Sequence, residues 1–195
     1  MLLRALRPFA AHPAVAEIVI PLPEHTLRNP PVWLREATGD RVRLVAGGAT
    51  RAESVHRGVS ALSDACTVIL VHDAARPLVT TDTVSAVLQR AANGAAAIAA
   101  VPVTDTVKLA DETGDWVLET VDRTRLWRAQ TPQGFPRQVL LDAYASRSNW
   151  AREGHTDEAA LVEAAGFRVA LVPDSTNNIK VTTPNDLIIA EALIQ

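Results

Sequence analysis

Short apolar runs alternate with amphipathic segments along most of the chain, and this alternation predicts strands that alternate with helices. Apolar runs typical of strands occupy residues 15–20, 42–46, 68–71, 95–101 and 168–172. Segments typical of helices lie near residues 2–10, 31–37, 55–62, 81–92, 136–148, 156–165 and 183–195. Because strand–helix alternation builds parallel sheets, the pattern predicts a single α/β domain over residues 1–195 with a doubly wound, mostly parallel sheet.

Residues 103–123 interrupt this alternation. Apolar segments at both ends of the stretch flank the polar turn 111–115, which predicts a β-hairpin that projects from the α/β frame as an arm. Trp116 and Val117 lie on this arm, where exposing them to water is unfavourable. A second copy of the chain would cover them, so we expect a homodimer through the arm. After the arm, residues 126–130 are a candidate for a further strand.

The apolar run 68–71 ends abruptly in the polar residues His72, Asp73 and Arg76. A buried parallel strand delivers polar groups to its carboxyl end in this way, and open α/β sheets bind ligands at that edge. The Asp73 carboxylate can hold a divalent cation or a hydroxyl, and the planar Arg76 guanidinium can hold a phosphate. Taken alone, these residues also fit a strand-end cap and a surface arginine.

Composition and charge narrow the range of partners. The formal net charge of −3 gives no general reason to expect nucleic acid or an anionic membrane as a partner. No apolar run approaches the ~20 residues of a membrane span, and the residues after Met1 lack the pattern of a signal peptide. The single cysteine, Cys66, excludes an internal disulfide and a cysteine-rich metal site. We therefore expect a cytoplasmic protein with no nucleic-acid and no membrane partner.

Polar residues and glycines gather where the predicted strands meet loops. These clusters are Gly47, Gly48, Arg51 and Ser54; Asp73 and Arg76; Thr104, Asp105 and Thr106; Arg123; Thr131; Thr156 and Asp157; and Lys180. Cations, hydroxyl donors and one carboxylate suit phosphoryl or nucleotidyl transfer, which needs mainly positioning and charge neutralisation. A Gly-x-Ser-x-Gly elbow and zinc-ligand spacing among the histidines are both missing, which argues against a serine hydrolase and a zinc enzyme. Individually, each cluster also fits a helix cap, a turn or a surface side chain.

Six motifs follow one another in the order of a known family. They are Val-His-Asp-Ala-Ala-Arg-Pro (71–77), Val-Thr-Asp-Thr-Val-Lys (103–108), Val-Asp-Arg (121–123), Gln-Thr-Pro-Gln-Gly-Phe (130–135), Thr-Asp-Glu-Ala (156–159) and Asn-Ile-Lys-Val-Thr-Thr-Pro (178–184). Through them, nearly the whole chain resembles the 2-C-methyl-D-erythritol 4-phosphate cytidylyltransferases of the non-mevalonate isoprenoid pathway. The resemblance implies a Rossmann-like fold with a dimerising arm. It also implies that the phosphate of methylerythritol phosphate attacks the α-phosphorus of CTP, with Mg²⁺, giving CDP-methylerythritol and pyrophosphate.

On the nucleotide side, the resemblance assigns roles to two short segments. Gly48 and Ser54 match positions that contact cytosine, and Ala49 lies between them. Asp73 matches the residue that touches the ribose and the metal, and Ala74 matches its neighbour in the nucleotide pocket. We therefore expect Mg²⁺ at Asp73.

On the acceptor side, the resemblance implies a pocket for methylerythritol phosphate and two cations that position its phosphate. The residues expected to line the pocket are Asp73, Arg76, Thr106, Thr131 and Thr156. The two positioning cations are expected to be Arg123 and Lys180. Because Thr106 and Arg123 flank the arm, they are expected to serve the neighbouring subunit's site, which would make dimerisation a condition of activity.

The chain departs from the family pattern at its start. The family begins with a strand and a Gly-rich Ala-Ala-Gly-x-Gly-x-Arg loop followed by Pro-Lys, whereas this sequence begins with the helix expected after them. We expect that the first strand and the Gly-rich loop, roughly thirty residues, are absent, that activity is impaired, and that two strands are left with unpaired edges. Either Met1 is an internal residue of a longer working enzyme, which we favour, or the chain is a non-catalytic remnant. A further alternative is a cytidylyltransferase for another polyol phosphate, such as ribitol 5-phosphate.

Overall fold

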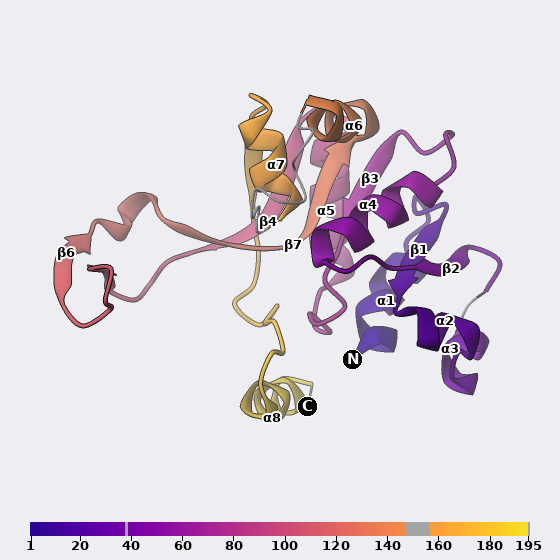
Figure 1. Cartoon of the computed structure of the whole chain (residues 1–195), viewed down its shortest axis with the longest axis horizontal. Helices are drawn as coiled ribbons and strands as arrows, with labels where there is room; N and C mark the ends of the chain where they lie inside the picture. Colours follow the sequence, from indigo (N-terminus) through magenta and orange to yellow (C-terminus); the bar gives the residue numbers. More distant parts are fainter. Residues whose placement is uncertain (38, 147–156, 195) are drawn as a thin grey trace.

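The computed structural model describes residues 1–37, 39–146 and 157–194, and it has the alternating α/β architecture that the sequence predicts (Figure 1). The strands of the body are β1 (Ile18–Leu22), β2 (Val42–Ala46), β3 (Val68–Val71), β4 (Ala96–Pro102), β7 (Trp127–Pro136) and β8 (Val169–Pro173). The helices are α1 (Leu2–Ala11), α2 (Glu24–Arg28), α3 (Val32–Ala37), α4 (Arg51–Ala61), α5 (Thr81–Ala92), α6 (Arg137–Ser146), α7 (Glu158–Ala164) and α8 (Pro184–Ala192). The arm contains β5 (Val107–Ala110), β6 (Val117–Val121) and the 3₁₀ helix η1 (Arg123–Arg125).

The strands of the body form two sheets in the described part of the chain. One sheet has four strands in the order β3-β7-β4-β8, and the other is the parallel pair β1-β2. β4 and β8 are parallel, whereas β7 runs antiparallel to both β3 and β4. The doubly wound α/β fold is therefore confirmed, and β7 is its antiparallel member.

β7 is longer than the sequence predicts. It begins at Trp127 and ends at Pro136, where the sequence predicts the start of a helix; α6 begins one residue later. The polar side chains of Gln130, Thr131 and Gln133 hide this strand from a hydropathy pattern. All three are buried, because each finds hydrogen-bond partners inside the protein.

The ends of β1 and α8 show that some element boundaries follow from local sequence signals and others depend on tertiary packing. β1 continues through Pro21, which the sequence predicts as its stop, and a proline is tolerated because the described residues leave β1 at a sheet edge. α8 begins as predicted, with Pro184 in its first turn and a capping box between Thr183 and Asp186. It ends at Ala192, before the predicted end of the helix at the last residue.

Helices pack on both faces of the four-stranded sheet. On one face, Val87 of α5 packs with Ala97 and Ala99 of β4. On the other face, Phe135 of β7 packs with Leu140 of α6, in a cluster that also includes residues of α4 and α7. Alternate residues of each strand reach opposite faces, so the sheet has an apolar layer on both sides. Loops at the strand ends are left to carry the polar residues.

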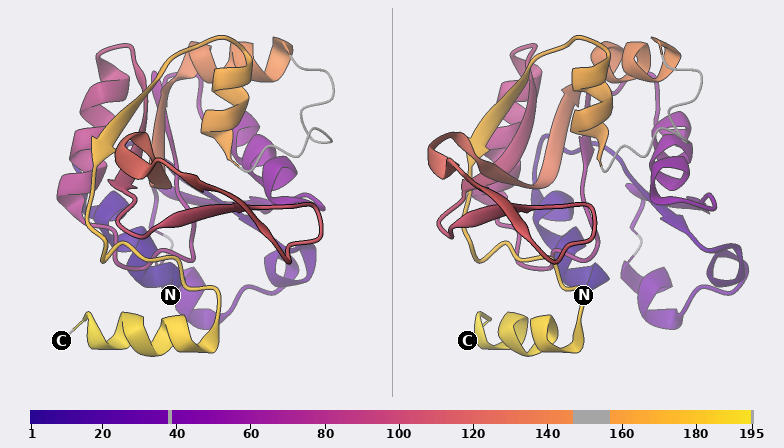
Figure 2. Two further views of the ribbon diagram at one scale, coloured as in Figure 1. Left: turned by 90° about the vertical axis from the view of Figure 1, so that its left-hand side faces the viewer. Right: turned by 60° about the vertical axis from the view of Figure 1, so that its left-hand side comes forward.

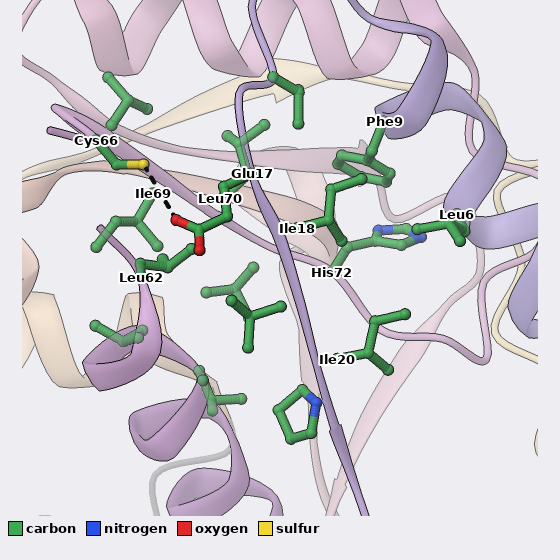
Figure 3. A pocket seen from close by; sticks show the side chains of 18 of the residues that line it. Leu6, Phe9, Glu17, Ile18, Ile20, Leu62, Cys66, Ile69, Leu70 and His72 are labelled. Atoms are coloured by element: carbon green, nitrogen blue, oxygen red, sulfur yellow. Dashed lines mark hydrogen bonds between the residues drawn. The ribbon is translucent and has the colours of Figure 1, made fainter. Parts of the chain in front are cut away.

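A cavity of about 640 Å³ separates the two sheets. Figure 3 shows Phe9 of α1 and Ile20 of β1 among the side chains that line it, together with Leu62 and Ile69 on the opposite side of the view. Among the described residues, β1 pairs only with β2 and β3 pairs only with β7, so two strand edges border this cavity without a partner strand. These are the unpaired edges that the sequence comparison leads one to expect.

The arm stands away from the body (Figures 1 and 2). Its two strands pair antiparallel, with Val107 opposite Val121, within the predicted limits of 103–123. Trp116 is 75% exposed and Leu118 is 65% exposed. Because Val117 and Leu109 are exposed as well, the arm has an uncovered apolar surface in the described chain.

Candidate functional site

The site forms where β3 ends. The backbone turns after Val71, with the amide of Arg76 donating a hydrogen bond to the carbonyl oxygen of Asp73 at 2.9 Å. The Lys180 ammonium lies 2.8 Å from Asp73 Oδ2, and Arg51 Nε donates to Asp73 Oδ1 at 3.2 Å. Asp73 and Lys180 are 107 positions apart along the chain, and the sheet brings them into contact as the strand-end prediction requires.

A buried acid holds the Arg51 guanidinium from the other side. Arg51 Nη1 donates to both carboxylate oxygens of Glu158, at 3.1 and 3.0 Å, and Glu158 is 3% exposed. The sequence shows Glu158 only within the motif 156–159, and it gives Arg51 no partner. The available sequence signal was the position of Glu158 directly after Asp157, the N-cap residue of α7. Such a position does not show whether an acid faces solvent or the interior.

The charges around Asp73 determine its protonation. Burial works against the charged carboxylate, but the hydrogen bond from Lys180 and the charge of Arg51 outweigh it and lower the pKa of Asp73 below its ordinary value. Burial raises the pKa of Glu158 in spite of the neighbouring Arg51. Asp73 is thus kept as an anion that can interact with a cation or a hydroxyl.

Thr131 and His72 hold the backbone of the turn. Thr131 Oγ1 accepts a hydrogen bond from the amide of Asp73 at 3.0 Å and lies 2.9 Å from His72 Nδ1. His72 Nε2 lies 3.1 Å from the carbonyl oxygen of Arg76 and must donate to it, so Nδ1 accepts from the Thr131 hydroxyl. This requires a neutral imidazole, and burial lowers the pKa of His72 to about 4. In this structure, the Thr131 hydroxyl orients Asp73.

Asn178 anchors the loop that carries Lys180. Its side-chain amide donates to the carbonyl oxygen of Thr131 at 2.9 Å and to Asp174 Oδ2 at 2.7 Å. Its own carbonyl oxygen accepts from Arg76 Nη1 at 2.7 Å. The sequence shows Asn178 only as the first residue of the motif 178–184 and gives it no role of its own. The residue is 2% exposed, and its bonds fix Lys180 beside Asp73.

Arg76 is a third cation near Asp73 and belongs to the turn itself. Nη1 binds the Asn178 carbonyl oxygen, and Nη2 lies 3.4 Å from the carbonyl oxygen of Ala129. Burial lowers the pKa of Arg76, although Asp73 and Asp174 favour its charged form. Its Nε is buried and has no hydrogen-bond partner among the residues that the structure describes. Arg76 therefore ties the Asp73 turn to the Lys180 loop, with one buried donor still unsatisfied.

The turn expected to contact cytosine, here called the base-side turn, contains Gly48 and Ala49 and directly precedes α4. The Gly48 amide donates to Ser54 Oγ at 3.0 Å, and the Ala49 amide donates to Glu53 Oε2 at 2.7 Å. A side chain at Gly48 would place its Cβ 2.3 Å from the Cβ of Glu53, so only glycine fits this close approach. Together with Ala74, which follows Asp73, these residues lie at the same end of the structure as Arg51. Ser54, Asp73 and Ala74 are also among the residues that line the cavity.

The remaining predicted residues lie apart from this cluster. Thr106 and Arg123 belong to the arm, where both are exposed and neither makes a hydrogen bond or ion pair with the described residues around Asp73. Thr156 lies outside the described residues. The helix predicted near residues 156–165 is α7, which begins at Glu158 with Asp157 as its N-cap; the Asp157 side chain accepts from the amide of Ala160.

The residues around Asp73 fit a Mg²⁺ ion only if a bound substrate supplies some of the metal ligands. Among the described residues, no group of three or more His, Cys, Asp or Glu side chains could hold a metal by itself. Asp73 supplies one carboxylate, and Mg²⁺ in nucleotide sites is commonly bound by one or two carboxylates plus substrate phosphates and water. Asp73 is thus a candidate ligand for a metal that arrives with a polyphosphate.

No helix in the described part of the chain is long and apolar enough to cross a membrane.

The fold and the site together define a nucleotidyltransferase-like α/β protein. A family model described as 2-C-methyl-D-erythritol 4-phosphate cytidylyltransferase matches residues 1–195. The chain therefore belongs to this family, as its motifs suggested.

Individual relatives agree with this assignment. The chain is 44% identical over 197 residues to the bifunctional enzyme IspD/IspF of Anaeromyxobacter sp. (strain Fw109-5), covering 100% of this chain and 50% of that protein. It is 41% identical over 195 residues to the 2-C-methyl-D-erythritol 4-phosphate cytidylyltransferase of Pelotomaculum thermopropionicum, covering 99% of this chain and 80% of that protein. The crystal structure of the Thermus thermophilus cytidylyltransferase matches with a TM-score of 0.80 and 37% identity, covering 98% and 85% of the two chains. The chain spans about half the length of the bifunctional relatives it matches.

Proposed function

We propose that the protein containing this chain transfers a cytidylyl group from CTP to 2-C-methyl-D-erythritol 4-phosphate, releasing pyrophosphate. The observation that carries the proposal is the Asp73 cluster. In it, the largely buried Asp73 carboxylate forms ion pairs with Lys180 and Arg51 at the end of β3. Family membership supports the substrate pair, because relatives of similar sequence are named for this reaction. We also propose a cytoplasmic homodimer that assembles through the arm.

In this proposal, the residues of the chain bind and orient the two substrates. Asp73 receives the ribose and would hold the Mg²⁺, and Gly48, Ala49, Ser54 and Ala74 form the nucleotide side. When bound, Mg²⁺ would neutralise part of the triphosphate charge. Asp73 stays ionised for this task, because Lys180 and Arg51 stabilise its charged form.

In this proposal, Lys180 guides the acceptor phosphate. Its side chain is 42% exposed, whereas that of Asp73 is 15% exposed, so the ammonium lies on the solvent side of the pair. A lysine ammonium is a compact charge on a flexible side chain. It can therefore contact an arriving phosphate while the other hydrogen bonds around Asp73 stay in place. In the proposed dimer, Thr106 and Arg123 reach the acceptor pocket from the neighbouring arm, and Arg76, Thr131 and Thr156 complete that pocket.

Replacing Lys180 tests the assignment of the acceptor side. In the complete protein that contains this chain, we expect Lys180→Ala to lower kcat/KM for methylerythritol phosphate by roughly 100-fold, since a charge-assisted contact to a phosphate is lost. The affinity for CTP should change by a smaller factor than kcat/KM for methylerythritol phosphate. Pyrophosphate release measures the first quantity, and calorimetric titration with CTP and Mg²⁺ measures the second.

Arg90→Ala is the matched control, because it removes an exposed cation from α5, away from the Asp73 cluster. It should leave both quantities unchanged. A collapse of CTP affinity in Lys180→Ala, with normal use of the acceptor, would contradict the role given to Lys180. A preference of the unmodified protein for ribitol 5-phosphate over methylerythritol phosphate would overturn the proposed substrate.

A further inference from the structure

Glu158 is a buried acid at a point where the fold does not require a charge. It is the first residue of α7 and packs beside apolar neighbours such as Ala159 and Leu161, which are buried on the same helix. A buried carboxylate is unfavourable unless it is paired and hydrogen-bonded. In the described residues its charged partner is Arg51, whose Nη1 reaches both of its oxygens.

The start of α7 is held so that Glu158 faces Arg51. Gln133 of β7 donates from Nε2 to Asp157 Oδ2 at 2.7 Å, and its Oε1 accepts from the amide of Ala159 at 3.1 Å. Gln133 is itself buried, with 1% of its surface exposed. The two residues that flank Glu158 are thus both fixed to the sheet, and the direction of the Glu158 side chain is fixed with them.

Arg51 connects the buried Glu158 to the turn after β3 that carries Asp73. The same guanidinium that binds Glu158 through Nη1 donates from Nε to Asp73 Oδ1. Arg51 is also the first residue of α4, directly after the turn that holds Gly48 against Ser54. One planar group therefore touches the carboxylate proposed to bind ribose and metal, and belongs to the helix that follows the base-side turn.

We propose that Glu158 and Arg51 are positioning residues for nucleotide and metal binding. Glu158 fixes the plane of the Arg51 guanidinium, and Arg51 fixes Asp73 Oδ1, so that Oδ2 is the oxygen presented toward Lys180 and an arriving cation. This role rests on the proposed function of Asp73 in binding metal-bound CTP. Neither Glu158 nor Arg51 needs to touch the reacting atoms.

The pairing also has an electrostatic purpose. Arg51 and Lys180 balance Asp73 and Glu158, so the four side chains carry no formal net charge. Without the charge of Glu158, the cluster would be positive where a cation must bind. Arg51 would also lose its fixed orientation, and both changes would weaken metal binding at Asp73.

The test is Glu158→Gln, which keeps the size of the side chain and removes its charge. In the complete protein, we expect the half-saturating Mg²⁺ concentration to rise roughly tenfold, as one uncompensated charge at this range would cause. Calorimetric titration with CTP at several Mg²⁺ concentrations should show the same loss without any turnover. The kcat at saturating Mg²⁺ and CTP should remain within about twofold of the unmodified value, because positioning is restored when the site is filled.

Glu163→Gln is the matched control, because it removes the same charge from an exposed position on the same helix. It should leave the Mg²⁺ requirement unchanged. An unchanged Mg²⁺ requirement in Glu158→Gln, or an equal rise in Glu163→Gln, overturns the proposal. A lower kcat with unchanged Mg²⁺ and CTP affinities also overturns it, because a merely structural ion pair would lower only the folded fraction.

A second variant keeps the test valid if Glu158→Gln does not fold. Arg51→Met combined with Glu158→Gln removes both partners and leaves no buried unpaired charge. We expect its half-saturating Mg²⁺ concentration to exceed that of the unmodified protein, by less than the roughly tenfold rise expected for one uncompensated charge, because the excess positive charge is gone but Asp73 has lost its Arg51 donor. A double variant indistinguishable from the unmodified protein overturns the positioning role.

The two proposals fail in different ways. If the unmodified protein binds Mg²⁺ and CTP but does not release pyrophosphate with methylerythritol phosphate, the proposed substrate is wrong, and the calorimetric arm still decides the role of Glu158. If the unmodified protein turns over normally, and Glu158→Gln has the same Mg²⁺ requirement as the unmodified protein, only the positioning role is wrong.

Discussion

At the scale of single residues, the site depends on buried amide and carboxylate groups as much as on its cations. Asn178 illustrates this, because its side chain bonds Thr131 on β7 and Asp174 after β8, while its carbonyl oxygen receives Arg76. A polar residue in a turn is usually solvated, and nothing local shows that this one is enclosed. Its partners come from separate strands, so its role exists only in the folded protein.

Asn178→Ala should therefore destabilise the protein and disturb the alignment of Lys180. It removes the donor to the Thr131 carbonyl oxygen and to Asp174 Oδ2, which should lower the free energy of unfolding by about 2–3 kcal/mol, although Thr83 still donates to Asp174 Oδ1. Urea unfolding monitored by circular dichroism measures this loss. Asn177→Ala, at the exposed neighbouring position, should change the free energy of unfolding by less than about 0.5 kcal/mol. Equal effects of the two substitutions would show that the Asn178 side-chain bonds contribute little.

At the scale of elements, the arm is the part of the fold whose sequence conflicts most with its surroundings. β5 and β6 pair with each other, yet Trp116 and Leu118 stay exposed in the single chain. A two-stranded hairpin has no interior of its own, so these side chains can be buried only by another surface. In a dimer they would supply the aromatic and aliphatic anchors on which interfaces commonly depend.

Trp116→Asp combined with Leu118→Asp should separate the proposed dimer. We expect the dimer dissociation constant to rise by at least about 30-fold, since losing a buried anchor commonly costs 2 kcal/mol or more. Sedimentation equilibrium measures this constant. Trp33→Asp, which alters an exposed tryptophan on α3, is the control and should leave the dimer intact. A monomeric unmodified protein, or a dimeric arm variant, would refute assembly through the arm.

At the scale of the whole molecule, the cavity between the two sheets sets the distribution of stability. β4 has strand partners on both sides, whereas β1 and β3 each have an edge along the cavity in the described chain. Backbone groups on such edges lack strand partners, and regions with few buried contacts open at lower cost. The four-stranded sheet is therefore expected to be the most stable part of this structure.

Hydrogen exchange can measure this difference in the 195-residue chain. We expect the slowest amides in β4 to exchange at least about 100-fold more slowly than those of β1, because β4 is paired with both β7 and β8. Mass spectrometry of exchanged peptides, or NMR, reports the rates strand by strand. Comparable protection of β1 and β4 would show that the cavity edges are closed in solution.

Much of the fold could be predicted because its signals are local. The helix start at Thr183 follows from a capping box and a proline, and the buried run 68–71 is recognisable as a strand from its apolar residues alone. Strand–helix alternation then implied the doubly wound sheet. β7 could not be delimited in this way, since its buried polar residues imitate a loop, and Pro21 could not be recognised as part of an edge strand.

The sequence by itself determined the order of elements, the strand end that carries Asp73, and the motifs that place the chain in its family. Only the tertiary structure decided which residues meet there: Lys180 on Oδ2, Arg51 on Oδ1, and the buried Glu158 behind Arg51. The physical reason is distance along the chain. Caps and apolar periods act over a few residues, whereas a charge cluster is assembled from loops that the sheet brings together and a helix that packs against it.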